Sequence, residues 1–264
     1  MKEELVTIWQ AVLLGIIQGL TEFLPVSSSG HLVIGEHFLG ITEPELIFNV
    51  AVHFATVVAV MIFFRKELFK MIRSFFVKDD AEGRRMAYFL IIGTIPAAIA
   101  GVGFKSFFER LFESAFVAAI MLLLTAVILI STKFAGKSKK EMWKMKWLDV
   151  LVIGIAQALA IFPGISRSGA TIAASLHLGI SRKDAARFSF LLSLPAIIGA
   201  TLLQAREVST LAGSDLLVLL AGMISAGLVG YLAMAMMMRI VSGGKLYYFG
   251  FYCLSAGILT LIFL

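Results

Sequence analysis

GIIQGLTEFLPVSSSG, residues 15–30, occurs twice in this chain in closely related form. The second copy is GIAQALAIFPGISRSG, residues 154–169, which aligns with the first without a gap and shares eight of its sixteen residues. In each copy an apolar arm is broken at Pro and followed by a Ser/Gly run. The chemical groups are divided between them: Glu22 and the following His31 belong to the first copy, and Arg167 and the following Thr171 to the second. This division predicts one site built from both halves of the chain.

The composition indicates that most of the surface faces lipid. The 264 residues are 59% hydrophobic and 15% charged, with a mean hydropathy of +0.95, whereas soluble domains carry about 25% charged residues. The net charge of +6 does not indicate nucleic-acid binding, because the basic residues lie in loops between apolar runs, as in membrane proteins. The single cysteine, Cys253, lies in an apolar run and excludes an intramolecular disulfide.

The apolar runs predict an all-α polytopic membrane protein with one domain, residues 1–264. About 20 helical residues cross the hydrocarbon core of a bilayer. The runs divide into a first repeat, residues 1–134, a basic linker, residues 135–147, and a second repeat, residues 148–264. They are Leu5–Leu24, Leu46–Phe64, Met86–Phe104 and Ala115–Phe134 in the first half, and Leu148–Phe162, Phe188–Leu203, Leu216–Met238 and Leu246–Leu264 in the second.

The distribution of Lys and Arg predicts that the two halves have opposite orientations. Segments 65–85 and 133–146 hold seven and six basic residues, which favours the cytoplasm, whereas segment 25–45 holds none and favours the outside. These assignments agree if each copy of the motif forms a re-entrant helical hairpin, followed by three transmembrane helices. The fold expected is therefore an inverted-topology repeat, whose broken helices meet near the midplane of the membrane. The alternative is an eight-span bundle, which the shortness of Leu148–Phe162 disfavours.

Gln18 and Glu22 are four residues apart and project from one face of a helix. A carboxylate inside a membrane is costly, by roughly 2.5–3.5 kcal/mol on insertion scales, and indicates a functional group. The structural alternative is a salt bridge between Glu22 and Arg167. Both interpretations can hold together, because a carboxylate that orients an Arg side chain also prepares it to bind phosphate oxygens.

The two Ser/Gly runs are expected at helix N-termini, because each follows a chain break and precedes an apolar segment. Free N–H groups and the helix dipole make such ends anion sites, although Ser there can also be an ordinary N-cap. His31, close to Ser28 and Glu22 in sequence, is a candidate acid, base or phosphate acceptor. The remaining histidines are expected in packing or interface roles. The candidate binding residues are Gln18, Ser27, Ser29, Gly30, Ser166, Ser168, Gly169 and Thr171.

These motifs resemble those of the undecaprenyl-diphosphate phosphatase family of the bacitracin-resistance type. The similarity rests on QGLTE at Gln18–Glu22, on FLPVSSSGH at Phe23–His31 and on PGISRSGAT at Pro163–Thr171, and the arrangement of spans extends it to the whole chain. The resemblance implies an integral enzyme of the bacterial inner membrane that hydrolyses undecaprenyl diphosphate, recycles the carrier lipid for peptidoglycan synthesis and opposes bacitracin. It also implies an active site that opens to the periplasm.

The mechanism expected from the residues and the resemblance assigns four catalytic groups. Arg167 holds the diphosphate, Ser28 or Ser27 is the nucleophile or positions water, and Glu22 and His31 handle protons. The resemblance implies Mg²⁺ or Ca²⁺, for which Glu22 is a candidate ligand, although one carboxylate cannot specify a metal site. The expected partners are the polyprenyl diphosphate and membrane lipid, with a homodimer as one candidate assembly and no nucleic acid.

A transporter is the alternative from another class, because inverted repeats with hairpins at the midplane are transporter architecture. Loss of phosphate release without loss of diphosphate binding, in a Ser28→Ala or His31→Ala variant, would favour the enzyme. A structural scaffold leaves the duplicated polar motifs without a reason.

Overall fold

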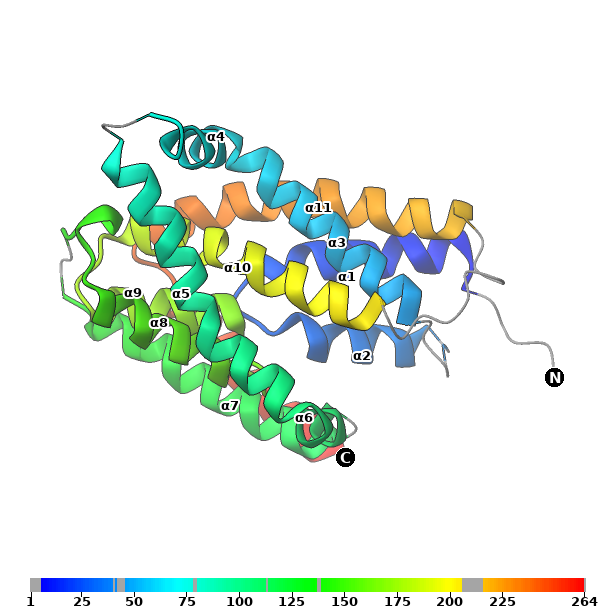
Figure 1. Cartoon of the computed structure of the whole chain (residues 1–264). Helices are drawn as coiled ribbons and strands as arrows, with labels where there is room; N and C mark the ends of the chain where they lie inside the picture. The colour runs from blue at the N-terminus through cyan, green and yellow to red at the C-terminus, as the bar shows by residue number, and fades with distance from the viewer. Residues whose placement is uncertain are drawn as a thin grey trace.

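The computed structural model describes residues 6–39, 41, 46–77, 80–112, 114–136, 139–205 and 216–263. The described residues fold into α-helices and two short 3₁₀ turns, and form no β-strand (Figure 1). The elements of the first half are α1 (Ile8–Phe23), α2 (Ser28–Phe38), α3 (Leu46–Phe63), α4 (Arg65–Ser74), α5 (Ala81–Gly103), α6 (Lys105–Phe112), α7 (Ala115–Ser131) and η1 (Thr132–Phe134). Those of the second half are η2 (Met142–Lys144), α8 (Trp147–Leu159), α9 (Arg167–His177), α10 (Arg182–Ala205), α11 (Leu216–Ser242) and α12 (Tyr248–Phe263).

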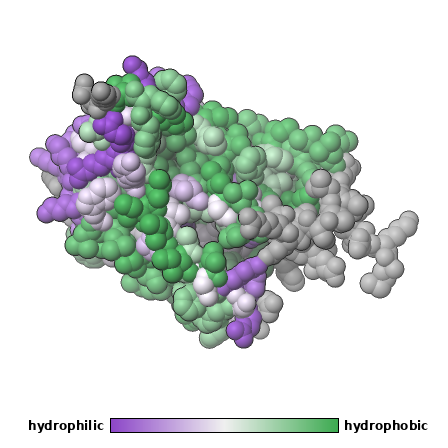
Figure 2. Space-filling view, viewed as in Figure 1, coloured by the Kyte–Doolittle hydropathy of each residue, from purple (hydrophilic) through white to green (hydrophobic). Residues whose placement is uncertain are grey.

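Four of the described helical segments are long and apolar enough to cross a membrane: Ala81–Gly103, Ala115–Phe134, Arg182–Gln204 and Leu216–Ser242. The pair α3–α4, which bends by 75°, adds a fifth if it is counted as one span, while α1, α8 and α12 are shorter apolar helices. Hydrophobic side chains cover most of the visible helices, and hydrophilic ones gather mainly at the end that holds α4 (Figure 2). The chain is therefore an all-α polytopic membrane protein.

Each copy of the motif forms two short helices joined by a break, α1–α2 in the first half and α8–α9 in the second. The α1–α2 hairpin extends from the end of the molecule near the N-terminus, whereas α8 and α9 lie toward the opposite end (Figure 1). The breaks themselves meet. The Ser168 hydroxyl lies 3.3 Å from the Leu24 carbonyl, and a Cβ on Gly169 would lie 3.1 Å from the Cβ of Pro25.

Glycines of the motif allow each hairpin to pack against the opposite half. A side chain on Gly15 would overlap the Gly222 carbonyl of α11. A Cβ on Gly154 would lie 2.5 Å from the Gly93 carbonyl of α5. Small residues let membrane helices approach closely and gain dispersion contacts. The N-terminal hairpin is thus held by a C-terminal helix and the second hairpin by an N-terminal one, which interlocks the two halves.

Two helices begin earlier than the apolar runs predict. α5 begins at Ala81 because Asp80 caps it, with the Asp80 side chain accepting from the Gly83 amide. α10 begins at Arg182 because Ser181 precedes it, and its hydroxyl accepts from the Asp184 amide at 3.3 Å. Polar first turns therefore extend both helices beyond the hydrophobic segments.

Candidate functional site

The first break is held by unusual backbone geometry. Ser27 has a φ of 71°, a left-handed conformation that non-glycine residues adopt only at some cost. This conformation directs its carbonyl to His31, whose Nδ1 lies 2.9 Å from the oxygen and whose amide donates to the same oxygen at 3.4 Å. The strained residue therefore fixes the start of α2, where Ser28 is the first helical residue.

The second break is held by side chains. Ser166 caps α9, because its hydroxyl accepts from the Gly169 amide at 3.2 Å. Gly164, with a φ of 96°, makes the turn before it. Thr125 on α7 binds both the turn and the cap, since its hydroxyl donates to the Gly164 carbonyl at 2.9 Å and accepts from the Ser166 amide at 3.2 Å. This places Arg167 at the first position of α9.

Glu22 connects the two halves at the centre of the site. Arg167 Nη2 donates to its Oε1 at 2.6 Å. Its Oε2 accepts from the Ser28 hydroxyl at 2.9 Å and from Gln18 Nε2 at 3.1 Å. Glu22 is 9% exposed, and a buried charge is tolerated only when it is paired and hydrogen-bonded in this way. The structure thus brings together Gln18, Glu22, Ser28 and Arg167.

Arg167 retains capacity to bind an anion. Its Nη2 is committed to Glu22, but its Nη1 makes only a 3.5 Å contact with the Ser189 carbonyl. A guanidinium oriented by a carboxylate on one side can present its remaining N–H groups to phosphate oxygens. The N-termini of α2 and α9, which begin at Ser28 and Arg167, add the positive ends of two helix dipoles.

Several predicted binding residues are instead engaged with the protein. Thr171 is fully buried; its hydroxyl donates to the Arg167 carbonyl at 2.8 Å and lies 2.6 Å from the Ser189 hydroxyl, so it holds α9 to α10. Ser166 and Ser168 are both buried. Ser166 caps α9, and Ser168 binds the Leu24 carbonyl of the first break. Ser29 lies 3.3 Å from Ser27 through their hydroxyls, while Gly30 and Gly169 supply backbone at the two N-termini.

His31 is oriented differently from the expectation. Its Nδ1 is bound to the Ser27 carbonyl, and its Nε2 lies 2.6 Å from the Tyr252 hydroxyl on α12. Both ring nitrogens thus have partners other than Ser28 and Glu22. The physical reason is the left-handed Ser27, whose carbonyl captures the imidazole.

Sequence reasoning missed His53, a polar side chain beside Glu22. The sequence predicts a packing or interface role for His53, yet its Nε2 lies 4.0 Å from Glu22 Oε2 and its Nδ1 lies 2.8 Å from the Asn49 carbonyl. A polar stripe of Asn49, His53 and Thr56, at helical spacing in an apolar run, was the signal available. Gln157, the counterpart of Gln18, is buried, and neither of its amide atoms has a hydrogen-bond partner among the described residues.

The donor set does not fit a divalent ion held by the protein alone. Both oxygens of Glu22 are already hydrogen-bonded. The part of the chain that the structure describes contains no group of three or more His, Cys, Asp or Glu side chains placed to hold a metal. Mg²⁺ and Ca²⁺ need several oxygen ligands. Beside Glu22, the buried Gln18 Oε1 has no hydrogen-bond partner among the described residues, and these oxygens supply only part of such a shell.

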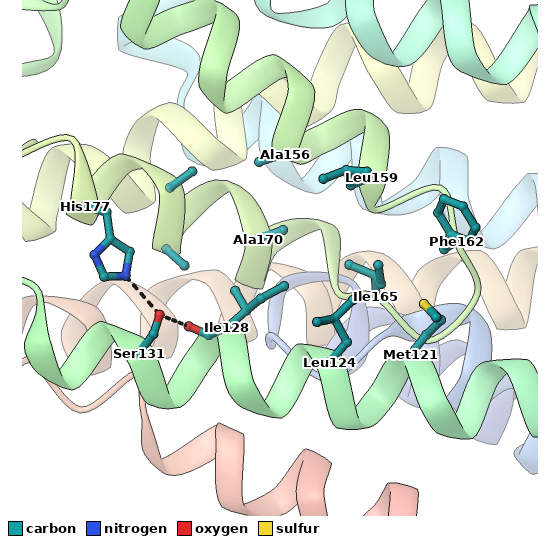
Figure 3. A pocket seen from close by; sticks show the side chains of 12 residues that line it. Met121, Leu124, Ile128, Ser131, Ala156, Leu159, Phe162, Ile165, Ala170 and His177 are labelled. Atoms are coloured by element: carbon teal, nitrogen blue, oxygen red, sulfur yellow. Dashed lines mark hydrogen bonds between the residues drawn. The ribbon is translucent and has the colours of Figure 1, made fainter.

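An apolar groove lies between α7, α8, α9 and the second break (Figure 3). Its volume is about 450 Å³, within the range of small-molecule sites. Phe162 lies toward one end, and Ser131 and His177, whose side chains are 2.9 Å apart, lie toward the other. Ile165 and Ala170 line it directly before and after the Ser166–Gly169 turn, so the groove begins beside the anion site.

The sequence is similar to known proteins over nearly its whole length. A family model described as bacitracin resistance protein BacA matches residues 11–259. An undecaprenyl-diphosphatase of Desulfosudis oleivorans is 46% identical over 271 residues, covering 96% of this chain and 97% of the relative. One of Methanosphaera stadtmanae is 42% identical over 97% of both chains. One of Carboxydothermus hydrogenoformans is 42% identical over 96% of both.

Proposed function

Because this chain belongs to the bacitracin resistance protein BacA family, we propose that it hydrolyses undecaprenyl diphosphate to undecaprenyl phosphate and phosphate. The reaction recycles the carrier lipid for envelope polymer synthesis and confers resistance to bacitracin. The observation that carries the proposal is the junction of Ser28, Glu22 and Arg167, in which a hydroxyl, a carboxylate and a guanidinium from both halves meet within hydrogen-bonding distance.

The proposed reaction begins with binding of the diphosphate by Arg167 and by the N–H groups at the starts of α2 and α9. Ser28 Oγ attacks the terminal phosphorus while its proton passes to Glu22 Oε2, which already accepts its hydrogen bond at 2.9 Å. The bond to the bridging oxygen breaks, and undecaprenyl phosphate leaves. Arg167 stabilises the charge that develops on the transferring phosphoryl group.

Water then attacks the phosphoserine, the bond between phosphorus and Ser28 Oγ breaks, and inorganic phosphate is released. Glu22 returns its proton to Ser28 Oγ and thereby restores the hydroxyl. The water must lose a proton, and we assign its acceptance to His31, the imidazole at the start of α2. The requirement for Mg²⁺ or Ca²⁺ stays a prediction. The proposed steps involve only protein groups and water, because the protein oxygens around Glu22 do not complete a metal-binding site.

The lipid tail needs an apolar path from this site. We assign the first part of the tail to the groove between α7, α8 and α9, because Ile165 and Ala170 join it to the Ser166–Gly169 turn. A flexible prenyl chain there stays out of water, and the rest of it lies in the bilayer. The diphosphate is thus bound at the N-terminus of α9, and the first part of its tail lies along the side of that helix that carries Ala170, Ala173 and Ala174.

The expected location is the bacterial inner membrane, with the site open to the periplasm. The opposite placement of the two hairpins in Figure 1 supports an inverted repeat. In that arrangement the N-terminus of α1 faces the periplasm and that of α8 the cytoplasm. A homodimer stays a candidate assembly.

The test is phosphate release by the purified, detergent-solubilised protein from a long-chain prenyl diphosphate. Glu22→Ala and Arg167→Ala are each expected to reduce kcat by roughly 100- to 1,000-fold, the range for loss of one charge-stabilising group. Glu67→Ala removes a different Glu–Arg contact between the halves, that with Arg187, and is expected to retain activity. Assays with and without chelator decide the metal requirement.

No release by folded wild-type protein that binds the lipid would overturn the proposal and favour a transporter. Release that survives in both the Glu22 and the Arg167 variant would instead place the chemistry elsewhere in the molecule.

A further inference from the structure

The His31 imidazole is held between the two halves of the protein. On one side its Nδ1 lies 2.9 Å from the Ser27 carbonyl of the first break. On the other its Nε2 lies 2.6 Å from the Tyr252 hydroxyl, which belongs to α12 near the end of the chain. The two rings also stack, with centroids 5.7 Å apart and planes inclined by 20°.

These contacts determine the protonation pattern of His31. A backbone carbonyl can only accept a hydrogen bond, so Nδ1 must carry a proton. In the neutral imidazole Nε2 is then the lone-pair atom, and the Tyr252 hydroxyl donates to it. When Nε2 takes up a proton, the same hydroxyl can rotate and accept from it. Tyr252 can therefore pair with Nε2 in both protonation states, and its hydroxyl turns away from the lone pair when that nitrogen accepts a proton from water.

We propose that Tyr252 is a positioning residue for the phosphatase reaction: the Ser27 carbonyl sets the tautomer of His31, and the Tyr252 hydroxyl fixes the orientation of the ring and of Nε2, the nitrogen that accepts the proton from water. This proposal rests on the function proposed above. It assigns to α12 a part in a site otherwise built from the two hairpins.

The surroundings of Tyr252 favour this role over a packing role. Its side chain is 48% exposed, so the core does not depend on its ring. The neighbouring Cys253 anchors α12 to the same break, with its Sγ 3.5 Å from the Pro25 carbonyl. α12 also packs against α7, where Gly250 and Gly257 permit close approach. The Tyr252 hydroxyl is therefore the group of this helix that reaches His31.

The first test is the kinetics of Tyr252→Phe, which removes only the hydroxyl. We expect kcat for phosphate release to fall by roughly 10- to 100-fold, at or below the lower end of what general acid–base catalysis contributes. KM and the thermal midpoint should stay near the wild-type values, because the ring and its exposure are retained. Tyr248→Phe, on the same helix and exposed, is the matched control and should leave kcat unchanged.

The second test follows His31 directly and does not depend on activity. The chain has four histidines, so ¹⁵N-histidine labelling in lipid nanodiscs gives a spectrum in which His31→Gln identifies the His31 signals. Tyr252→Phe should shift the Nε2 resonance of His31 and leave the other three histidines in place. Tyr248→Phe should shift none of them.

An unchanged kcat in Tyr252→Phe would overturn the proposal, and so would an unshifted His31 resonance. A raised KM with an unchanged kcat would assign Tyr252 to substrate binding instead, which also overturns it. Failure of the proposed function has a different signature, since wild-type protein would then release no phosphate while the resonance shift could still be measured.

Discussion

At the scale of single residues, Glu22 joins the two halves of the chain, because it binds Arg167 of the second break and Ser28 of the first. The pairing of Glu22 with Arg167 followed from the duplicated motif, because each break carries one of the two charges. His31 was expected beside Ser28, but the left-handed backbone of Ser27 draws it to a carbonyl, and no sequence pattern indicates such a φ. Tyr252 was missed because its contact with His31 spans almost the whole chain and leaves no periodic signal.

Ser28 and Ser29 are adjacent hydroxyls with different partners, which makes them a matched pair of substitutions. Ser28→Ala removes the hydroxyl that donates to Glu22, so we expect phosphate release to fall by at least about 100-fold with KM nearly unchanged. Ser29→Ala removes a hydroxyl that contacts only Ser27 among the described side chains, and we expect less than a several-fold effect. Steady-state kinetics of both variants measures this. Full activity in Ser28→Ala would move the nucleophile to Ser27 or to water.

At the scale of elements, the apolar runs predict the hairpins and the long helices. They do not predict where a helix begins when a polar cap sets its first residue. The caps Asp80 and Ser181 start helices before the hydrophobic segment begins. α4 and α6 were not expected, because they are short helices with charged faces and not apolar runs. One face of each helix is polar, an amphipathic pattern that is visible in the sequence but lies outside the apolar runs.

Gly154 tests how far helix packing depends on the absence of a side chain. Gly154→Ala places a Cβ 2.5 Å from the Gly93 carbonyl of α5, and overpacking of this kind costs about 1–3 kcal/mol. We therefore expect a lower thermal midpoint in detergent. Gly199→Ala, in the interior of α10 with no atom within 4 Å of the added Cβ, is the control and should be neutral or slightly stabilising, because Ala favours helix. Equal midpoints for the two variants would contradict the packing argument.

At the scale of the whole molecule, each copy of the duplicated motif packs against a helix of the other half. Gly15 packs against α11 and Gly154 against α5, so neither hairpin is supported only by its own half. The sequence indicated this relationship, since the segments that begin at Gly93 and Gly222 resemble each other. It could not show which half contacts which, because that depends on the three-dimensional arrangement of helices of similar composition. The separation of polar and apolar surface in Figure 2 is consistent with the basic segments facing one side of the membrane.

The orientation of the hairpins can be measured with single introduced cysteines. Cys253, the only native cysteine, is buried, so it should react little with a membrane-impermeant thiol reagent. Thr7 and Lys144 are both exposed, before α1 and in the turn that precedes α8. If the two halves begin on opposite sides of the membrane, Thr7→Cys should be labelled in intact cells, and Lys144→Cys should be labelled only after the membrane is opened. Labelling of both in intact cells, or of neither, would contradict the inverted repeat. Labelling of Lys144→Cys alone would reverse the orientation that the basic residues predict.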